Sequence, residues 1–161
     1  MKKELLFRGF VVTALLLTPH LVGAAQGLSL TQAKAMIEAS EKKATEIKKP
    51  MNIAVVDEGG NLLAFARMDN SILVSIQISI DKAWTAAALK LPTAALTPLS
   101  QPGQPLFGIH TTNQGRVVIF GGGLPIQMGE QVVGGLGVSG GSVEQDMQVA
   151  EAGLAAFGKA K

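Results

Sequence analysis

The chain has 161 residues, a formal net charge of +2 and no cysteine. This length suits one domain with its own core, and the lack of cysteine excludes disulfides and thiolate metal ligands. The nearly balanced charge gives no indication of nucleic acid or of an anionic membrane surface as a partner.

Residues 1–25 follow the order of a signal peptide. A basic start at Lys2-Lys3 precedes an apolar run over 9–17, and small residues follow over 23–25. The apolar run is too short for a transmembrane helix, which needs about 20 residues. We therefore expect a periplasmic or secreted protein without stable membrane insertion.

Cleavage after Ala24 or Ala25 would leave a single domain over 26–161. It would reduce the basic residues from 14 to 11 and the acidic residues from 12 to 11, so the mature chain would be neutral. A neutral surface is compatible with self-association.

The first half of the mature chain predicts a helix, a hairpin and a second helix. A helical stretch begins at Thr31, a good N-cap residue, and ends before Pro50. Apolar runs over 51–57 and 62–68 flank a turn and predict a β-hairpin. Residues 71–90 fit both a strand period and a helix stripe; the strong helix formers after Asp81 favour one helix.

The second half predicts strands and a final helix. A connection rich in Pro, Thr and Ser, with a helical turn near 93–96, leads to strands expected over 116–120, 124–128 and 131–138. Ser142 and Gln145 have the spacing of a capping box at the start of the last helix. Short, hairpin-linked strands favour an antiparallel sheet covered by helices, which is an α+β fold.

Two catalytic signatures overlap near the C-terminus, and both are excluded by their context. Residues 135–140 read G-x-G-x-x-G, but the chain is too short after them for the second strand of a dinucleotide site. Residues 137–141 read G-x-S-x-G, but both histidines precede Ser139, the reverse of the hydrolase order. Glycines in strands instead indicate close approach of another backbone, a ligand or a neighbouring subunit.

Several motifs, in order, resemble the GlcG/HbpS-like family, which includes the C-terminal domain of PduO-type proteins. They cover most of the chain from residue 29 to residue 157: VVDEGGNL at 55–62, KAWTA at 82–86, TNQGR at 112–116, FGGGLPI at 120–126 and VSGGSVEQD at 138–146. The resemblance implies a profilin-like α/β sandwich with a five-stranded antiparallel sheet flanked by helices. It also implies haem binding and octameric assembly. Many relatives have a histidine where this chain has Asn61.

His110 is the main candidate for a haem ligand, because it would be the only histidine in the mature chain. Haem iron accepts imidazole, thioether sulfur or oxygen, so Met68, Met128, Thr111 and Thr112 are alternative ligands. A solvent-exposed or structurally hydrogen-bonded histidine is the competing interpretation.

Arg67 and Arg116 could bind haem propionates, since guanidinium binds carboxylates with two hydrogen bonds. The competing interpretation is an ion pair with Asp57, Asp69 or Glu144. Glu144 and Asp146 follow the expected helix start, where acidic groups complement the helix dipole and need no catalytic role.

We therefore expect a haem- or tetrapyrrole-binding protein that sequesters, senses or transfers its ligand, with a sensor or transport protein as a partner. One alternative is an enzyme acting on a small organic acid through Arg67, Arg116 and Glu144 within an oligomeric assembly. Another is an assembly component whose glycines serve packing. No catalytic residue is assigned.

Overall fold

The computed structural model describes residues 27–159, and the expected signal segment lies outside them. The main elements, in chain order, are α1 (Leu30–Glu46), β1 (Asn52–Asp57), β2 (Leu62–Arg67), α2 (Ser75–Leu89), α3 (Leu96–Leu99), β3 (Gly123–Met128), β4 (Gln131–Ser139) and α4 (Val143–Leu154). Four short 3-10 helices complete the set: η1 (Thr93–Ala95), η2 (Ile109–Thr111), η3 (Asn113–Gly115) and η4 (Phe157–Lys159).

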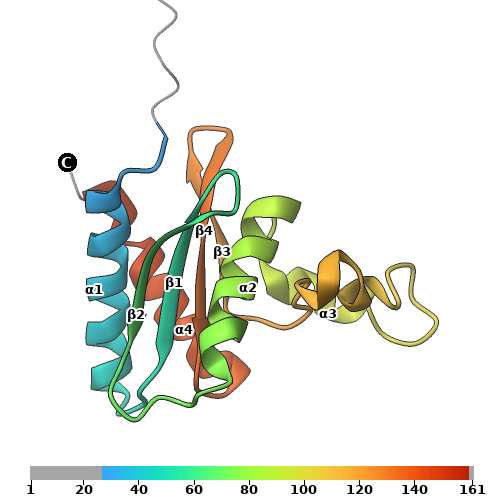
Figure 1. Cartoon of the computed structure of the whole chain (residues 1–161), viewed down its shortest axis with the longest axis horizontal. Helices are drawn as coiled ribbons and strands as arrows, with labels where there is room; N and C mark the ends of the chain where they lie inside the picture. Colours follow the sequence, from blue (N-terminus) through green and yellow to red (C-terminus); the bar gives the residue numbers. More distant parts are fainter. Residues whose placement is uncertain (1–26, 160–161) are drawn as a thin grey trace, which may run out of the picture.

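The strands form one antiparallel sheet in the order β2-β1-β4-β3. Helices α1 and α4 cover one face of the sheet, and α2 covers the other (Figure 1). This arrangement confirms the α+β class and the antiparallel sheet. None of the helices over residues 27–159 combines the length and the apolar character that a membrane span requires.

The first helix begins two residues earlier than predicted. Ser29, and not Thr31, is its N-cap: the Ser29 hydroxyl accepts a hydrogen bond from the Gln32 amide at 3.2 Å. The Gln32 side chain in turn accepts one from the Ser29 amide at 3.0 Å, which completes a capping box. The capping box predicted for Ser142 and Gln145 is confirmed at the start of α4.

The helix predicted over 71–90 is present, but it is shorter: α2 begins at Ser75 and ends at Leu89. The preceding residues are held outside the helix by Asn52, whose side chain is fully buried in β1. Its amide donates to the Ile72 carbonyl at 3.0 Å and accepts from the Ser71 hydroxyl at 3.2 Å. A buried polar group needs such partners, so tertiary contacts set the start of α2.

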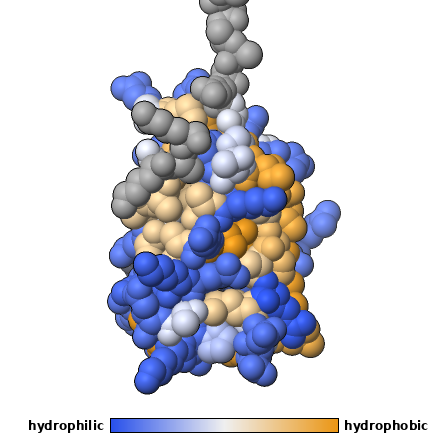
Figure 2. All heavy atoms as spheres, turned by 90° about the vertical axis from the view of Figure 1, so that its left-hand side faces the viewer, coloured by the Kyte–Doolittle hydropathy of each residue, from blue (hydrophilic) through white to orange (hydrophobic). Residues whose placement is uncertain are grey.

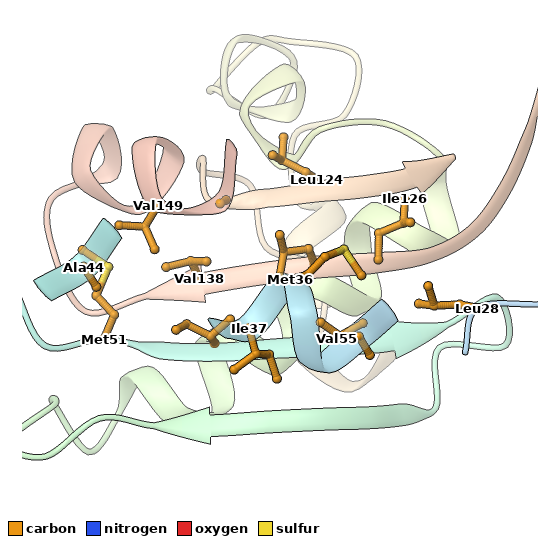
Figure 3. Close-up of a cluster of buried hydrophobic side chains, with 14 of the residues drawn as sticks. Leu28, Met36, Ile37, Ala44, Met51, Val55, Leu124, Ile126, Val138 and Val149 are labelled. Atoms are coloured by element: carbon orange, nitrogen blue, oxygen red, sulfur yellow. The ribbon is translucent and has the colours of Figure 1, made fainter. Parts of the chain in front are cut away.

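Alternation along β1 divides the core between the two faces of the sheet. Ile53 and Val55 are fully buried toward α1 and α4, where the larger cluster lies (Figure 3). Ala54 and Val56 are buried toward α2. Successive side chains of a strand point to opposite faces, so one short strand supplies both cores.

Helix α2 lies directly on a glycine stripe in β4, which explains the false signatures. A Cβ at Gly135 would meet the Ala83 carbonyl, and a Cβ at Gly137 would meet the Ser79 carbonyl. The contacting atoms belong to the helix backbone, so side chains at these positions would push α2 off the sheet. The glycines of β4 therefore allow the backbone of α2 to approach the sheet closely, and no ligand or second subunit is needed to explain them.

The expected strand over 116–120 is wrong, and the sheet has four strands where five were predicted. Residues 116–120 pack against α2, but their backbone groups form hydrogen bonds with threonine hydroxyls and not with a neighbouring strand. The Thr85 hydroxyl donates to the Arg116 carbonyl at 3.1 Å and accepts from the Val118 amide at 3.0 Å. Thr97 donates to the Ile119 carbonyl at 2.9 Å.

The outer surface of α1 is polar. Exposed charged residues follow its length, including Lys34, Glu38, Lys42 and Glu46. Figure 2 shows this side, with hydrophilic side chains dominating its lower half and apolar patches between them. The distribution is that of an amphipathic helix whose other side covers the sheet.

Candidate ligand-binding site

Residues 92–120 form an arm that projects beyond α2 (Figure 1). A cavity of about 520 Å³ lies between α2 and the end of this arm. Its apolar walls come from Val74 and Ile78 of the α2 region and from residues 117–120. Gln77, Asp81 and His110 supply polar groups. A mostly apolar cavity of this size with few polar groups is typical of small-molecule sites.

His110 reaches this cavity from η2, in the arm that projects beside α2 in Figure 1. The imidazole is exposed, so it is accessible to a ligand. The neighbouring threonine hydroxyls are used locally: Thr111 donates to the Gly108 carbonyl at 2.8 Å, and Thr112 donates to the Ile109 carbonyl at 2.6 Å. Neither threonine lines the cavity.

Arg116 lies beside the cavity but does not line it. Its Nε donates to Asp81 Oδ1 at 3.2 Å, and its guanidinium lies 4.5 Å from the centroid of the Trp84 ring. The partner is thus Asp81 and none of the three acids expected from the sequence. Gln77 donates to the same Asp81 oxygen at 3.0 Å, which holds the carboxylate in place.

The other predicted residues lie elsewhere. Met68 and Met128 pack against the core on the α1/α4 face of the sheet, opposite α2. The Met68 sulfur accepts a hydrogen bond from the Met51 amide at 3.4 Å. Arg67 is exposed at the end of β2. Of the ligand residues predicted from the sequence, only His110 lines the cavity.

A buried ion pair that the sequence did not reveal lies behind the cavity wall. Lys82 Nζ donates to Asp146 Oδ2 at 2.7 Å and to the Val138 carbonyl at 2.9 Å. Asp146 also accepts from the Gly141 amide at 2.9 Å, and the ammonium lies 4.9 Å from the centroid of the Phe120 ring. The pair therefore joins α2, β4 and α4 to a residue that lines the cavity.

Burial disfavours the charged form of both Lys82 and Asp146, and their mutual attraction favours it. Burial lowers the pKa of Lys82 and raises the pKa of Asp146, while the attraction between the two groups acts against both shifts. The glycine run 121–123 makes room for the ammonium, since a Cβ at Gly122 would lie 2.6 Å from Lys82 Nζ. No spacing rule links Lys82 to an acid 64 residues later, so only the fold reveals the pair.

The turn between β1 and β2 is organised by Asp57. Its carboxylate accepts from the Asn61 side chain at 3.1 Å and from the Asn61 and Gly59 amides at 2.8 and 2.9 Å. Burial raises the pKa of Asp57, but these hydrogen bonds outweigh it and lower the pKa overall. Asn61 thus closes the turn through its side chain and its backbone amide.

The comparisons with known proteins agree with the motifs. The family described as "Haem degrading protein HbpS-like" matches residues 28–155. An uncharacterized 15.0 kDa protein of Citrobacter freundii is 48% identical over 130 residues, which are 81% of this chain and 92% of that protein. Protein GlcG of Escherichia coli is 35% identical over 112 residues, covering 70% of this chain and 81% of GlcG.

Two of the similar proteins are PduO proteins whose names include a tetrapyrrole. The corrinoid adenosyltransferase PduO of Citrobacter freundii is 42% identical over 133 residues, which are 83% of this chain but 40% of PduO. The crystal structure of a PduOC–haem complex has 39% identity and a TM-score of 0.79, and the match covers 81% of this chain and 95% of that one. On its motifs, its fold and the family match over 28–155, the chain belongs to the HbpS-like family.

Proposed function

We propose that this protein is an exported haem- or tetrapyrrole-binding protein that sequesters, senses or hands on its ligand. The observation that carries the proposal is His110 at the edge of an apolar cavity of about 520 Å³. The PduOC–haem complex supports it, because that structure has the same fold and 39% identity. When bound, the group would supply an iron centre for ligand sensing or redox chemistry.

The residues around the cavity fit such a ligand. The faces of a porphyrin are apolar, which suits the walls from Val74, Ile78 and residues 117–120. Haem iron accepts a neutral imidazole, and His110 is exposed to supply one. Arg116 lies between two residues that line the cavity, Gly115 and Val117, so it could bind a propionate at the cavity margin. Its hydrogen bond to Asp81 would hold the guanidinium in place.

The geometry favours binding over the alternative of an enzyme acting through Arg67, Arg116 and Glu144. None of the three lines the His110 cavity. PduO is named as an adenosyltransferase, but the present chain spans 40% of its length. Homo-oligomer formation stays a prediction; the exposed apolar residues Ile72, Leu73 and Val74 support it.

Haem titration of the purified protein tests the ligand and its contacts. We expect a Soret band on adding haem, and we expect His110→Ala to shift its maximum and weaken binding by roughly tenfold or more, about 1.4 kcal/mol. Arg116→Ala should weaken binding with little spectral change, since it would contact only the periphery. Met68→Leu is the matched control and should leave spectrum and affinity unchanged.

An unchanged spectrum and affinity in His110→Ala would remove His110 as the ligand. Met128 and the threonine hydroxyls would then be tested by the same titration. Absence of any Soret band in the unmodified protein would contradict the haem proposal itself.

Export is part of the proposal and is supported by the order of residues in 1–25, which lie outside the described residues. We expect the mature chain to begin at Ala25 or Gln26. Mass spectrometry of protein from the cell envelope and medium would identify this first residue. Intact Met1–Lys161 found in the cytoplasm would contradict export.

A further inference from the structure

A second, smaller hollow lies beside the Arg116 guanidinium and shares no lining residue with the His110 cavity. Its volume is about 180 Å³, and Trp84, Asn113, Gln114 and Arg116 line it. We propose that this hollow binds the carboxylate group of a small organic acid, with the Arg116 guanidinium as the main contact. The proposal does not depend on haem binding, although a haem propionate carries the same group.

Arg116 is oriented by contacts that leave its outer edge available. Asp81 accepts from Nε, and the Trp84 ring supports one face of the guanidinium plane. Within residues 27–159, neither terminal amino group of Arg116 makes a hydrogen bond. A guanidinium edge of this kind offers two parallel donors that match the two oxygens of a carboxylate.

Trp84 is itself fixed from the side of the β1–β2 turn. Gly60 has a φ of +76°, and a Cβ there would lie 2.5 Å from Trp84 Cδ1, so the turn backbone lies directly on the indole. The ring therefore cannot easily retreat from Arg116. A binding group whose supports are already packed loses little conformational freedom when its ligand arrives.

The rim of the hollow is polar and strained. Asn113 and Gln114 have φ angles of 51° and 61°, in the left-handed region that non-glycine residues rarely adopt. Such backbone strain is concentrated at ligand-binding and active sites. Asn113 donates to the Thr112 hydroxyl at 3.1 Å, and the Gln114 amide stands beside Arg116 as a further donor.

Size and charge define the ligand class. A hollow of about 180 Å³ has room for roughly six water-sized groups, at about 30 Å³ each, which suits an acid of two to four carbons. Asp81 offsets the charge of Arg116, so long-range attraction is weak and hydrogen-bond geometry decides selectivity. We expect a dissociation constant on the order of 1 mM.

Trp84 is the only tryptophan in the chain, so its fluorescence reports directly on this hollow. The experiment titrates haem-free protein with sodium lactate, with lactamide at matched ionic strength as the uncharged analogue. The Trp84 indole N–H resonance is followed by NMR in parallel. We expect a saturable response to lactate and none to lactamide or to sodium chloride.

Arg116→Gln should abolish the lactate response, and Arg116→Lys should weaken it at least tenfold because an ammonium lacks the paired donors. Arg67→Gln, which removes an exposed arginine from the end of β2, is the control and should bind lactate normally. Equal responses to lactate and lactamide, an undiminished response in folded Arg116→Gln, or no response in either readout would overturn the proposal.

A haem titration with and without saturating lactate distinguishes the two sources of the carboxylate. If lactate weakens haem binding, a propionate and the free acid share Arg116. If lactate binds but leaves haem affinity unchanged, the hollow serves a free acid alone. Failure of haem to bind would not alter the lactate result, so the two proposals fail separately.

Discussion

Gly137→Ala is expected to destabilise the protein by about 3 kcal/mol or more. Its Cβ would meet the Ser79 carbonyl and would lie 2.5 Å from the Ala83 amide nitrogen, and both atoms belong to the α2 backbone. No side-chain rotation relieves the clash, so a whole helix must shift, at the upper end of the cost of overpacking a core. Thermal unfolding should show a midpoint roughly 6–12 °C lower.

Gly158→Ala is the control for this substitution, because a Cβ at Gly158 meets nothing within 4 Å. It should change the free energy of unfolding by less than about 0.5 kcal/mol. A Gly137→Ala protein that melts with the unmodified protein would show that α2 does not lie on the glycine stripe as described.

Breaking the buried pair is the second large effect. Lys82→Met should cost about 3–5 kcal/mol, because it leaves the Asp146 carboxylate buried without its cation. Asp146→Asn should cost a similar amount, because burial already lowers the pKa of Lys82 and only the carboxylate opposes that effect. Denaturant unfolding of each variant measures the change.

The double variant Lys82→Met/Asp146→Asn should be more stable than either single variant, since neither charge then remains alone in the core. Lys43→Met is the matched control: its exposed pair with Glu46, at 3.4 Å, should contribute less than about 0.5 kcal/mol. Strictly additive losses in the double variant would contradict a coupled buried pair.

Elements that depend on neighbouring residues could be predicted from the sequence. The Ser142–Gln145 capping box and the β1–β2 hairpin around Asp57 each involve groups a few residues apart. The α2 helix also follows from the sequence, despite a competing strand period, because its second half is rich in strong helix formers. The helix starts differ from the prediction: Ser29 replaces Thr31 as the first N-cap because Gln32 lies at capping-box spacing from Ser29.

The same local rules failed over 116–120. An apolar run beside glycines is typical of a strand, and Val117 and Val118 at its centre are indeed buried. Whether such a run joins a sheet depends on what meets its backbone. Here the Thr85 and Thr97 hydroxyls do so, from positions 31 and 22 residues away along the chain.

The sequence by itself determined the α+β class, the hairpins and the capping box of α4, because these follow from composition and from the spacing of neighbouring residues. It also singled out His110, as the one histidine after the expected signal segment. Only the tertiary structure decided that His110 lines an apolar cavity, that Arg116 rests on Asp81 and Trp84, and that Lys82 is buried against Asp146. Those contacts join residues up to 64 positions apart, and they exist only after α2 has packed on the glycines of β4.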